Sequence, residues 1–392
     1  MPSLPAAPSS TPSDFRVLAR RDRWRRRASA WKLGNWLAQQ ERRSREGGAG
    51  EVERVRQLEG PTVEDWRAVP FRRTAGCGRS VVSDDGQVEL RSKAGVVYTA
   101  GLQTCASVWA CPVCRSKIAA HRQAEVAAAG RVHARAGGST GMLTLTVRHA
   151  QTDDLAELVA GIRKAWRRVQ QSKAWRPARH LVDGTITALE VTRGDNGWHP
   201  HLHVLVMGSD PVGMDELAEV ARRLWADSVV HMLGGEHRPN ATNGVHWTGA
   251  KQGDDAEVIA RYAAKLGAEV TRGDWKANDV LAQLLDGVEA GDVEAVARYL
   301  EYTAAMRGRN QQVWSRGFRG CLAELADGQG DDEATELLGA VVSDEQAAED
   351  DRGGDHVAFV DRRTWHRACR TWGAAGCVAI LEHYERVEPP PP

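Results

Sequence analysis

The chain has 392 residues, of which 27% are charged and 42% hydrophobic, a length that predicts two or three domains and a sizeable buried core. Basic and acidic residues number 52 each, so the net charge is zero, but they are unevenly placed. Residues 1–137 carry 24 basic and 13 acidic side chains, whereas residues 320–392 carry 6 and 16. This asymmetry indicates a polyanionic partner, with a solvated basic arm and a solubilising tail as the alternative.

No stretch approaches the roughly 18 apolar residues of a spanning helix, which excludes a transmembrane protein. The start, Met1–Pro5, has no basic head followed by an apolar run, so no secretory signal is seen. We therefore expect a cytoplasmic protein without a membrane partner. The seven cysteines are an odd number, and thiols in a cytosol stay reduced, so a cysteine cluster is first considered as a metal site.

The basic front contains a run of arginines at residues 20–27, followed by Trp31 and Trp36. Its spacing is compatible with a helix. Basic residues interleaved with Trp suit contacts to phosphates and bases, and a charged helix face with a Trp anchor fits the pattern equally well. If the first interpretation holds, these arginines supply affinity for a nucleic-acid backbone that falls steeply with salt.

Hydrophobic periodicity predicts the later elements in chain order. Short strands and turns are expected over residues 70–118. The expected elements that follow are a helix at 115–136, a strand at 141–147, a helix at 153–171, a hairpin of 185–193 with 198–207, a helix at 214–233, a strand at 245–247, helices at 255–268 and 291–306, and a last helix at 361–385. Residues 323–357 hold twelve acids and one Arg and are interpreted as a linker.

This order predicts an α+β fold with a central antiparallel sheet and helices packed on it. A small cysteine-rich module would precede the sheet, and a helical region would follow it. The predicted divisions are a basic, partly disordered or helical region at 1–70, a cysteine-rich module and helix at 71–137, a catalytic domain at 138–320, and an acidic linker with a C-terminal helix at 321–392.

The most informative segment is the strand that contains His201 and His203. Residues two apart in a strand point to the same face, so both imidazoles leave one side of the sheet, while Leu202 and its apolar neighbours anchor the other. A hairpin turn centred on Asp195 and Asn196 would place Glu190 directly opposite His201.

The same register places the small Ala188 opposite His203, which leaves room beside the imidazoles. Two imidazoles and one carboxylate, Glu190, make a three-ligand site for a divalent ion with open positions. His199 shares the face and is the rival third ligand. Zinc hydrolases and non-haem iron oxygenases use similar donors, so this set alone does not decide the chemistry.

A tyrosine downstream separates these alternatives. Tyr262 lies in a predicted helix with Lys265 three residues on, so the two share a face. A phenol near an ammonium and a divalent ion can lose its proton and attack a phosphorus atom. An amphipathic helix with a snorkelling Tyr is the structural alternative. Tyr299 and Tyr302 have no such Lys and are expected to pack in the next helix.

Four cysteines precede the sheet. Cys105, Cys111 and Cys114 lie within ten residues, with CxxC spacing between the last two, and Cys77 could complete a four-thiolate site. Thiolates at this spacing fit a tetrahedral, structural Zn²⁺ ion. The other three cysteines, at 321, 369 and 377, have no such spacing and are expected to be core residues.

Taken together, these residues resemble the HUH endonucleases, in particular the single-tyrosine initiators of rolling-circle plasmid replication from high-GC Gram-positive bacteria. Three motifs match in the family's order: the strand Leu143–His149, the segment His199–His203, and Tyr262–Lys265. Upstream, Cys111–Cys114 resembles a Cys-Pro-x-Cys element of related initiators. Downstream, the stretch from Arg307 to Ser315 also resembles theirs. The likeness spans roughly residues 71–320.

The resemblance implies a five-stranded antiparallel sheet and a Mg²⁺ or Mn²⁺ ion at Glu190, His201 and His203. It implies a nick at the plasmid's double-strand origin, with Tyr262 joined to the 5′ phosphate and the free 3′-OH priming synthesis. Plasmid DNA, single-stranded at the nick, is the expected partner. A host helicase and a host polymerase are the further partners that the resemblance implies. Lys265 would orient the phosphate or stabilise its charge.

One departure from the family affects how the reaction cycle of replication ends. Some relatives have a Glu one helical turn before the tyrosine, which activates the water that ends the cycle. This chain has Val258 at that position. Glu257 lies on a different helix face, and Asp255 and Glu269 are the alternative bases.

Three other functions remain open from the sequence. They are an HUH transposase or mobilisation nickase, a zinc-containing DNA-binding regulator without catalysis, and a metallo-hydrolase or oxygenase of small molecules.

Overall fold

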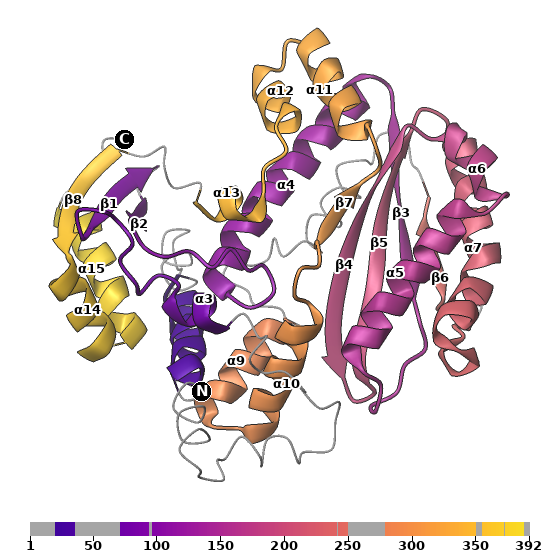
Figure 1. Ribbon diagram of the computed structural model, residues 1–392. Helices are drawn as coiled ribbons and strands as arrows, with labels where there is room; N and C mark the ends of the chain where they lie inside the picture. The colour runs from indigo at the N-terminus through magenta and orange to yellow at the C-terminus, as the bar shows by residue number, and fades with distance from the viewer. Residues whose placement is uncertain are drawn as a thin grey trace, which may run out of the picture.

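A computed structural model describes residues 20–35, 71–93, 96–240, 242–249, 279–349, 355–371 and 373–387 (Figure 1). The first elements are a helix over residues 20–35, α3 (Phe71–Gly76), β1 (Gln87–Lys93), β2 (Val96–Ala100), α4 (Pro112–Arg135), β3 (Ser139–Thr146), α5 (Leu155–Gln171), α6 (Trp175–Ala178), η2 (Arg179–Leu181), β4 (Gly184–Gly194) and β5 (Gly197–Gly208). The later ones are α7 (Pro211–Leu233), η3 (Gly235–His237), β6 (Val245–Thr248), α9 (Val280–Ala290), α10 (Val293–Ala305), β7 (Gln312–Trp314), α11 (Phe318–Gly328), α12 (Asp332–Gly339), α13 (Asp344–Glu349), β8 (Asp355–Asp361), α14 (Arg362–Thr371) and α15 (Gly373–Val387).

The central sheet has five strands in the order β6-β3-β5-β4-β7, and every neighbouring pair is antiparallel. The β4–β5 hairpin supplies its two longest strands. The predicted α+β class with a five-stranded antiparallel sheet is confirmed. The strand predicted at 141–147 is β3, and the helix predicted at 153–171 is α5. Asp154 caps the start of α5, because its side chain accepts a hydrogen bond from the amide of Glu157.

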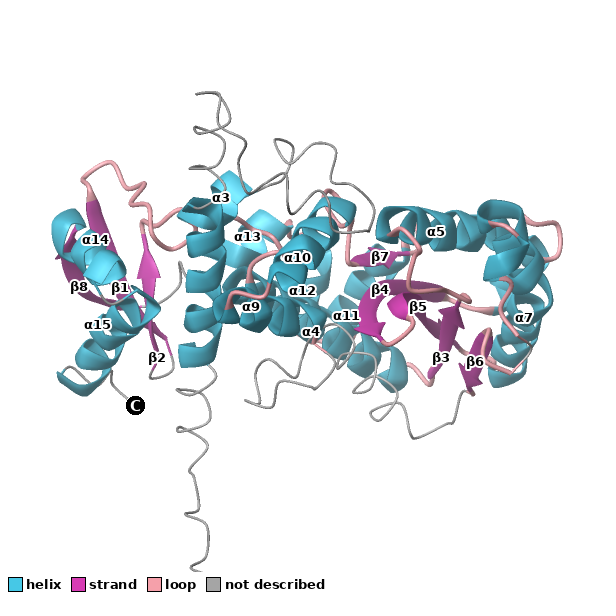
Figure 2. Ribbon diagram, turned by 90° about the horizontal axis from the view of Figure 1, so that it is seen from below, coloured by secondary structure: helices cyan, strands magenta, loops and turns pink. Residues whose placement is uncertain are grey.

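Helices cover both faces of this sheet (Figure 2). Alternate residues of β5 divide between the faces because a strand has a two-residue period. Leu202, Val204 and Val206 pack in one core cluster with residues of α5 and α7. Leu205 and Met207 pack in another with residues of α4, α11 and α12. His201 and His203 therefore lie on the face toward α4.

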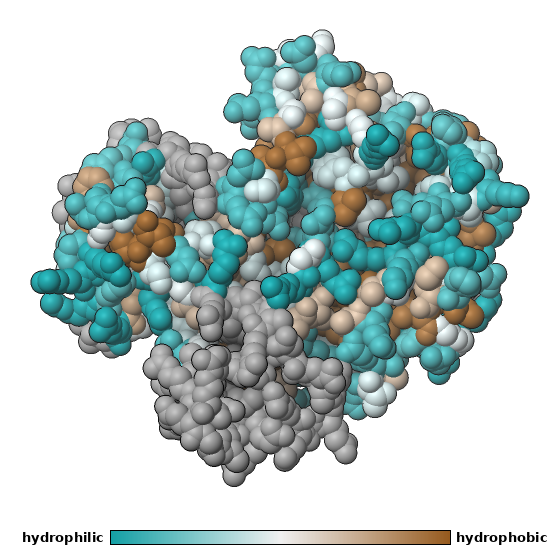
Figure 3. Space-filling model, in the orientation of Figure 1, coloured by the Kyte–Doolittle hydropathy of each residue, from teal (hydrophilic) through white to brown (hydrophobic). Residues whose placement is uncertain are grey.

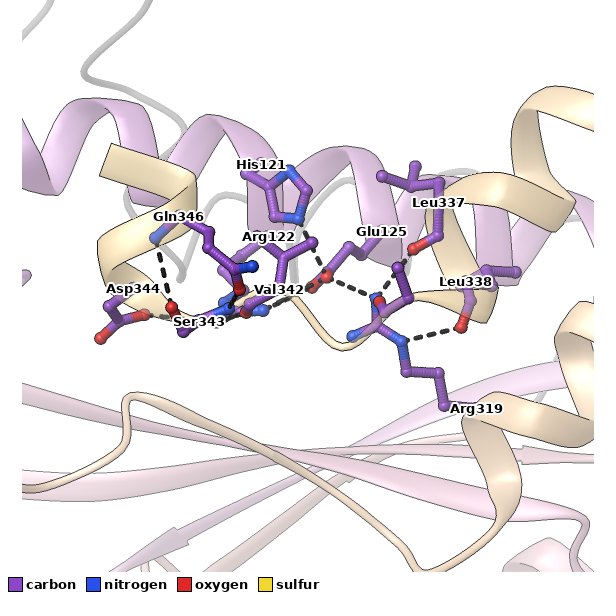
Figure 4. Close-up of polar contacts among 11 residues, drawn as sticks. His121, Arg122, Glu125, Arg319, Leu337, Leu338, Val342, Ser343, Asp344 and Gln346 are labelled. Atoms are coloured by element: carbon purple, nitrogen blue, oxygen red, sulfur yellow. Dashed lines mark hydrogen bonds and ion pairs between the residues drawn. The ribbon is translucent and has the colours of Figure 1, made fainter. Parts of the chain in front are cut away.

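A buried carboxylate joins α11, α12 and the α12–α13 connection to α4 (Figure 4). Glu125 is fully buried and accepts hydrogen bonds from Arg319 at 2.8 Å and from Arg122 at 3.1 Å, with His121 at 3.2 Å. Arg319 also donates to the carbonyl of Leu338 at 2.9 Å. Burial by itself would raise the pKa of Glu125, but the His121 hydrogen bond and the two guanidinium charges lower it overall.

We expect Glu125→Ala to lower the free energy of unfolding by about 3–5 kcal/mol, because it leaves the buried Arg319 charge without its carboxylate partner. Since the folded-state pKa of Glu125 lies below the usual value of about 4.3, this stabilisation is complete above that pH and is lost as pH falls through the folded-state pKa. Urea unfolding as a function of pH measures both effects. Glu333→Ala, at an exposed position of α12, is the control, and equal losses in the two variants would contradict the prediction.

The two ends of the described chain meet in a second module. Strand β8 pairs with β1, giving a three-stranded sheet in the order β2-β1-β8. Trp24 of the helix at 20–35 lies 6.3 Å from Trp31 and 6.2 Å from Trp365 of α14, measured between ring centroids. The core of this module also contains residues of α15. Segments from opposite ends of the sequence thus form one hydrophobic cluster.

Several expected elements differ from the structure. Much of the stretch 323–357, expected as a linker, is helical as part of α11, α12 and α13, because Leu322, Ala334 and Leu338 pack against α4. The last helix, expected at 361–385, is two helices, α14 and α15. The helix α9 was not predicted, and the helix expected at 255–268 lies outside the described residues. The predicted domain divisions stay predictions.

None of the described helices is both long enough and apolar enough to span a bilayer.

Candidate metal centres

The β4–β5 hairpin has the register expected from the sequence. Gly194 pairs with Gly197 next to the turn, and Glu190 pairs with His201, while Ala188 pairs with His203. Gly197 has a φ of +86° and lies against the backbone of Ala150 and Gln151, where a Cβ atom would approach within 2.9 Å. A glycine is therefore required at the turn that sets this register.

The hairpin brings Glu190, His201 and His203 together. The Nε2 atoms of His201 and His203 lie 2.9 and 2.8 Å from the same carboxylate oxygen, Oε2 of Glu190. Both imidazoles are buried, and Glu190 is half-buried. Burial by itself would raise the pKa of Glu190, but hydrogen bonds from the two imidazoles and their charges hold it well below its usual range.

The donor atoms of this trio fit a divalent cation. Nδ1 of His201 faces the carbonyl oxygen of His199 at 3.2 Å. A neutral ring that carries its proton on Nδ1 would leave the lone pair of Nε2 for a metal ion. All three ligand atoms lie within 4.8 Å of one another. The three residues Glu190, His201 and His203 could thus hold one metal ion from one side and leave its other positions open.

Thr144 on β3 fixes the orientation of His203. Its Oγ1 lies 3.1 Å from Nδ1 of His203, the residue it pairs with across the two strands. This contact directs Nε2 toward Glu190, which is the role of a partner behind a metal-binding imidazole.

We expect Thr144→Val to weaken metal binding about 10–100-fold, because the ring of His203 loses the partner that fixes its tautomer. Calorimetric titration with Mn²⁺ measures this change. Thr192→Val on β4 is the matched control, since Thr192 pairs with His199 and bonds none of the trio. An unchanged Mn²⁺ affinity in Thr144→Val would show that the contact does not orient the ligand.

His199, the rival third ligand, points elsewhere. Its Nδ1 lies 2.7 Å from Nε2 of His149, whose Nδ1 lies 2.9 Å from the carbonyl oxygen of Asn196. Burial, followed by the neighbouring charges of His201 and His149, lowers the pKa of His199 to about 4. His199 is therefore neutral at pH 7 and belongs to a histidine pair beside the trio.

An arginine near Glu190 was not predicted from the sequence. Arg115 on α4 forms an ion pair with Asp279 at 2.9 Å. Burial by itself lowers the pKa of Arg115, but the charges of Asp279 and Glu190 raise it overall, so this guanidinium is part of the electrostatic surroundings of the trio. Arg115 follows Cys114 directly, yet no local pattern in the sequence connects it with the later strand β4.

The two tyrosines expected to pack in a helix do so on α10. Tyr299 donates to the carbonyl of Ala110 at 2.8 Å, and Tyr302 stacks on Trp198 with ring centroids 5.9 Å apart. Both are fully buried, and burial raises the pKa of each phenol. The predicted nucleophile and its neighbours, Tyr262, Lys265, Asp255, Glu257, Val258 and Glu269, lie outside the described residues.

The four cysteines expected to form one site are brought together at the start of α4. The sulfur of Cys77 lies 3.9 Å from that of Cys111 and 3.5 Å from that of Cys114, and Cys105 lies 3.6 Å from Cys114. A tetrahedral ion with bonds of about 2.3 Å requires sulfur separations of about 3.8 Å. All four are buried, so the geometry fits a four-thiolate metal site.

The helix at 20–35 contacts this cluster directly. Arg27, which is buried, donates to the sulfur of Cys77 at 2.9 Å, and the indole nitrogen of Trp31 donates to the carbonyl of Cys77 at 3.0 Å. Burial opposes the charge of Arg27, but the surrounding sulfurs raise its pKa overall. A guanidinium in this position balances part of the negative charge of a four-thiolate metal site.

The remaining cysteines differ from one another. Cys369 and Cys377 are buried, as expected, with sulfurs 2.9 Å apart. Cys321 is exposed, so its assignment to the core was wrong. Cys321 lies on the outer side of α11, whereas the next residue, Leu322, packs against α4.

Comparisons with known proteins point to replication. Residues 98–211 match a family described as replication protein. The chain is 28% identical over 359 residues to Protein rep of Streptomyces lividans, a match that covers 73% of this chain and 76% of that protein. It is 28% identical over 151 residues to a neomycin resistance protein of Streptomyces cyanogenus, covering 32% of this chain and 35% of that protein. No solved structure shows a significant match. The segment that matches the family contains Glu190, His201 and His203.

Proposed function

We propose that this chain is a plasmid replication initiator, which nicks one DNA strand at a double-strand origin and stays joined to the new 5′ end. The observation that carries the proposal is the convergence of Glu190, His201 and His203 on one face of the five-stranded sheet. The similarity to the replication protein family and to Protein rep supports a role in replication, because the segment matched by the family contains this trio.

The trio would hold a Mg²⁺ or Mn²⁺ ion. When bound, this ion would polarise the oxygens of the scissile phosphate. Glu190 would contribute an anionic oxygen and the two imidazoles neutral nitrogens, while Thr144 would keep the ring of His203 in place. The thiolates of Cys77, Cys105, Cys111 and Cys114 would hold a structural Zn²⁺ ion that joins the helix at 20–35 to the start of α4.

Tyr262 is the proposed nucleophile. Its phenolate oxygen forms a bond to the phosphorus, the bond from phosphorus to the 3′ oxygen breaks, and the phenol's proton is balanced by the proton that the leaving 3′ oxygen takes up. The products are a 5′-phosphotyrosine ester and a free 3′-OH that can prime synthesis. Lys265, three residues further along the helix expected from the sequence, would stabilise the phosphate charge.

A covalent adduct tests this function. Full-length protein incubated with Mn²⁺ and a single-stranded oligonucleotide from the plasmid origin should give a protein–DNA band on a denaturing gel, and Tyr262→Phe should abolish it. Tyr384→Phe, on α15, should leave the band intact. Unaltered DNA under all conditions would instead indicate a zinc-containing DNA-binding regulator, and a metal-dependent reaction indifferent to Tyr262 would indicate a metallo-hydrolase.

The same chemistry could serve a transposase or a mobilisation nickase. Cleavage of an origin hairpin but not of a transposon end or a transfer origin supports the replication role. The reverse preference would support the nicking activity but overturn the replication role.

A further inference from the structure

Most arginines of the basic front that the structure describes are already paired within the protein. Arg20 forms an ion pair with Glu385 of α15, and Arg21 with Glu382. Arg25 and Arg26 both contact Asp286 of α9. The positive charge predicted to contact a nucleic acid is therefore largely used to fix the helix at 20–35 to other elements.

A different set of cations remains available on the module formed by the two chain ends. A pocket of about 800 Å³ lies between the helix at 20–35, the turn after Cys77, and α14 with the start of α15. Lys32, Arg79 and Arg370 line it, with His366 and the indole of Trp31. None of the described lining residues is acidic.

The cations of this pocket have no carboxylate partner among the described residues. Lys32 and Arg370 are exposed, and Arg79 is half-buried. His366 lines the pocket beside Arg79 and Arg370. Burial first, and then the positive charges of Arg362 and Arg370, lower the pKa of His366. A concentration of uncompensated positive charge attracts an anion.

The cationic surface continues beyond the pocket along α14. This ten-residue helix has four arginines and no acid, and its arginine side chains are exposed. Arg363, Arg367 and Arg370 lie at i, i+4 and i+7, so they share one face and extend over about 10 Å. The space-filling view shows a largely hydrophilic outer edge on the module formed by the two chain ends (Figure 3). A row of this length can contact several phosphates of one strand, whereas a free nucleotide would need only the pocket.

We propose that the pocket and the arginine face of α14 bind the phosphodiester backbone of DNA, at a site separate from the Glu190–His201–His203 trio. Guanidinium groups match phosphate oxygens in a bidentate geometry, and Trp31 gives the pocket an aromatic wall. The proposal rests on the proposed function, since that function supplies DNA as the partner. Its consequence is that the two ends of the chain together form a DNA-holding module next to the nicking domain.

The test compares DNA affinity at several salt concentrations. Full-length Lys32→Gln/Arg370→Gln is measured against Arg167→Gln/Arg223→Gln, which removes two exposed charges from α5 and α7, by fluorescence anisotropy with a random-sequence duplex. Loss of two phosphate contacts should reduce the slope of log affinity against log salt by about 1.8 and lower the affinity about tenfold or more. The control pair should behave as wild type.

Two further measurements separate the possible failures. Adduct formation with a short origin oligonucleotide should be unchanged in Lys32→Gln/Arg370→Gln, which shows that the protein folds and that the nicking site is intact. If wild type binds and nicks DNA but this variant has the salt slope of the control, the pocket proposal is overturned and the proposed function stands. If the variant instead loses only binding of inorganic phosphate or ATP, the pocket is a site for a free phosphate compound, which also overturns the proposal. A wild-type protein that binds no DNA would overturn the proposed function itself.

Discussion

Replacing His203 by glutamine will abolish tight binding of one Mn²⁺ ion and reduce the rate of metal-dependent DNA cleavage about 10³-fold or more. The imidazole would supply one of the three proposed ligand atoms, and a bound cation contributes several kcal/mol to the transition state of phosphoryl chemistry. Each step of about 1.4 kcal/mol in the barrier changes the rate by a factor of ten. Glutamine keeps a polar side chain of similar length, so the buried position stays filled. Calorimetric titration and single-turnover cleavage measure the two effects.

His199→Gln is the matched control for this experiment. It changes the same residue type on the same face of the same strand, four residues away, but His199 bonds His149 rather than Glu190. We expect this variant to bind Mn²⁺ and cleave DNA within a few-fold of wild type. If His199→Gln lost the ion and His203→Gln kept it, the ligand set would be wrong.

Replacing Cys114 by serine will remove one equivalent of zinc and lower the free energy of unfolding by about 4 kcal/mol or more, as expected for loss of a structural metal. The effect should extend beyond the cluster, because Arg27 and Trp31 dock the helix at 20–35 on Cys77. Without the metal, the buried Arg27 guanidinium loses most of the negative charge that it faces. Zinc analysis of the purified protein and chemical denaturation measure both effects.

Cys321→Ser is the control, since Cys321 is exposed on α11 and far in sequence from the cluster. It should change neither the zinc content nor the stability. A Cys114→Ser protein with wild-type zinc content and stability would show that the four sulfurs are free thiols in the core.

The parts of the site that could be predicted depend on short-range geometry. A two-residue strand period places His201 and His203 on one face, and the turn at Asp195 and Asn196 fixes which residue of β4 lies opposite each. The Glu190–His201–His203 trio follows from these two rules alone. The four cysteines follow from the spacing of thiolates that a tetrahedral ion requires.

The parts that could not be predicted depend on long-range packing. Nothing near Arg20 or Arg26 in the sequence indicates that each pairs with an acid from a distant part of the chain. The helices α12 and α13 were not predicted because residues 323–357 are mostly acidic and polar. The few apolar residues of α12 stabilise it by packing against α4. Arg115 reaches the surroundings of Glu190 only because α4 packs across the sheet, a contact without a local pattern.

In the proposed reaction, the phenol of Tyr262 and a cation held by Glu190, His201 and His203 act on the same phosphorus atom. Mass-spectrometric mapping of the residue that carries DNA, after nuclease and protease digestion of the Mn²⁺ reaction, tests it most directly. We expect a nucleotide on the peptide that contains Tyr262, formed by wild type and absent from His203→Gln. A nucleotide on another residue, or one on Tyr262 that still forms in His203→Gln, would contradict it.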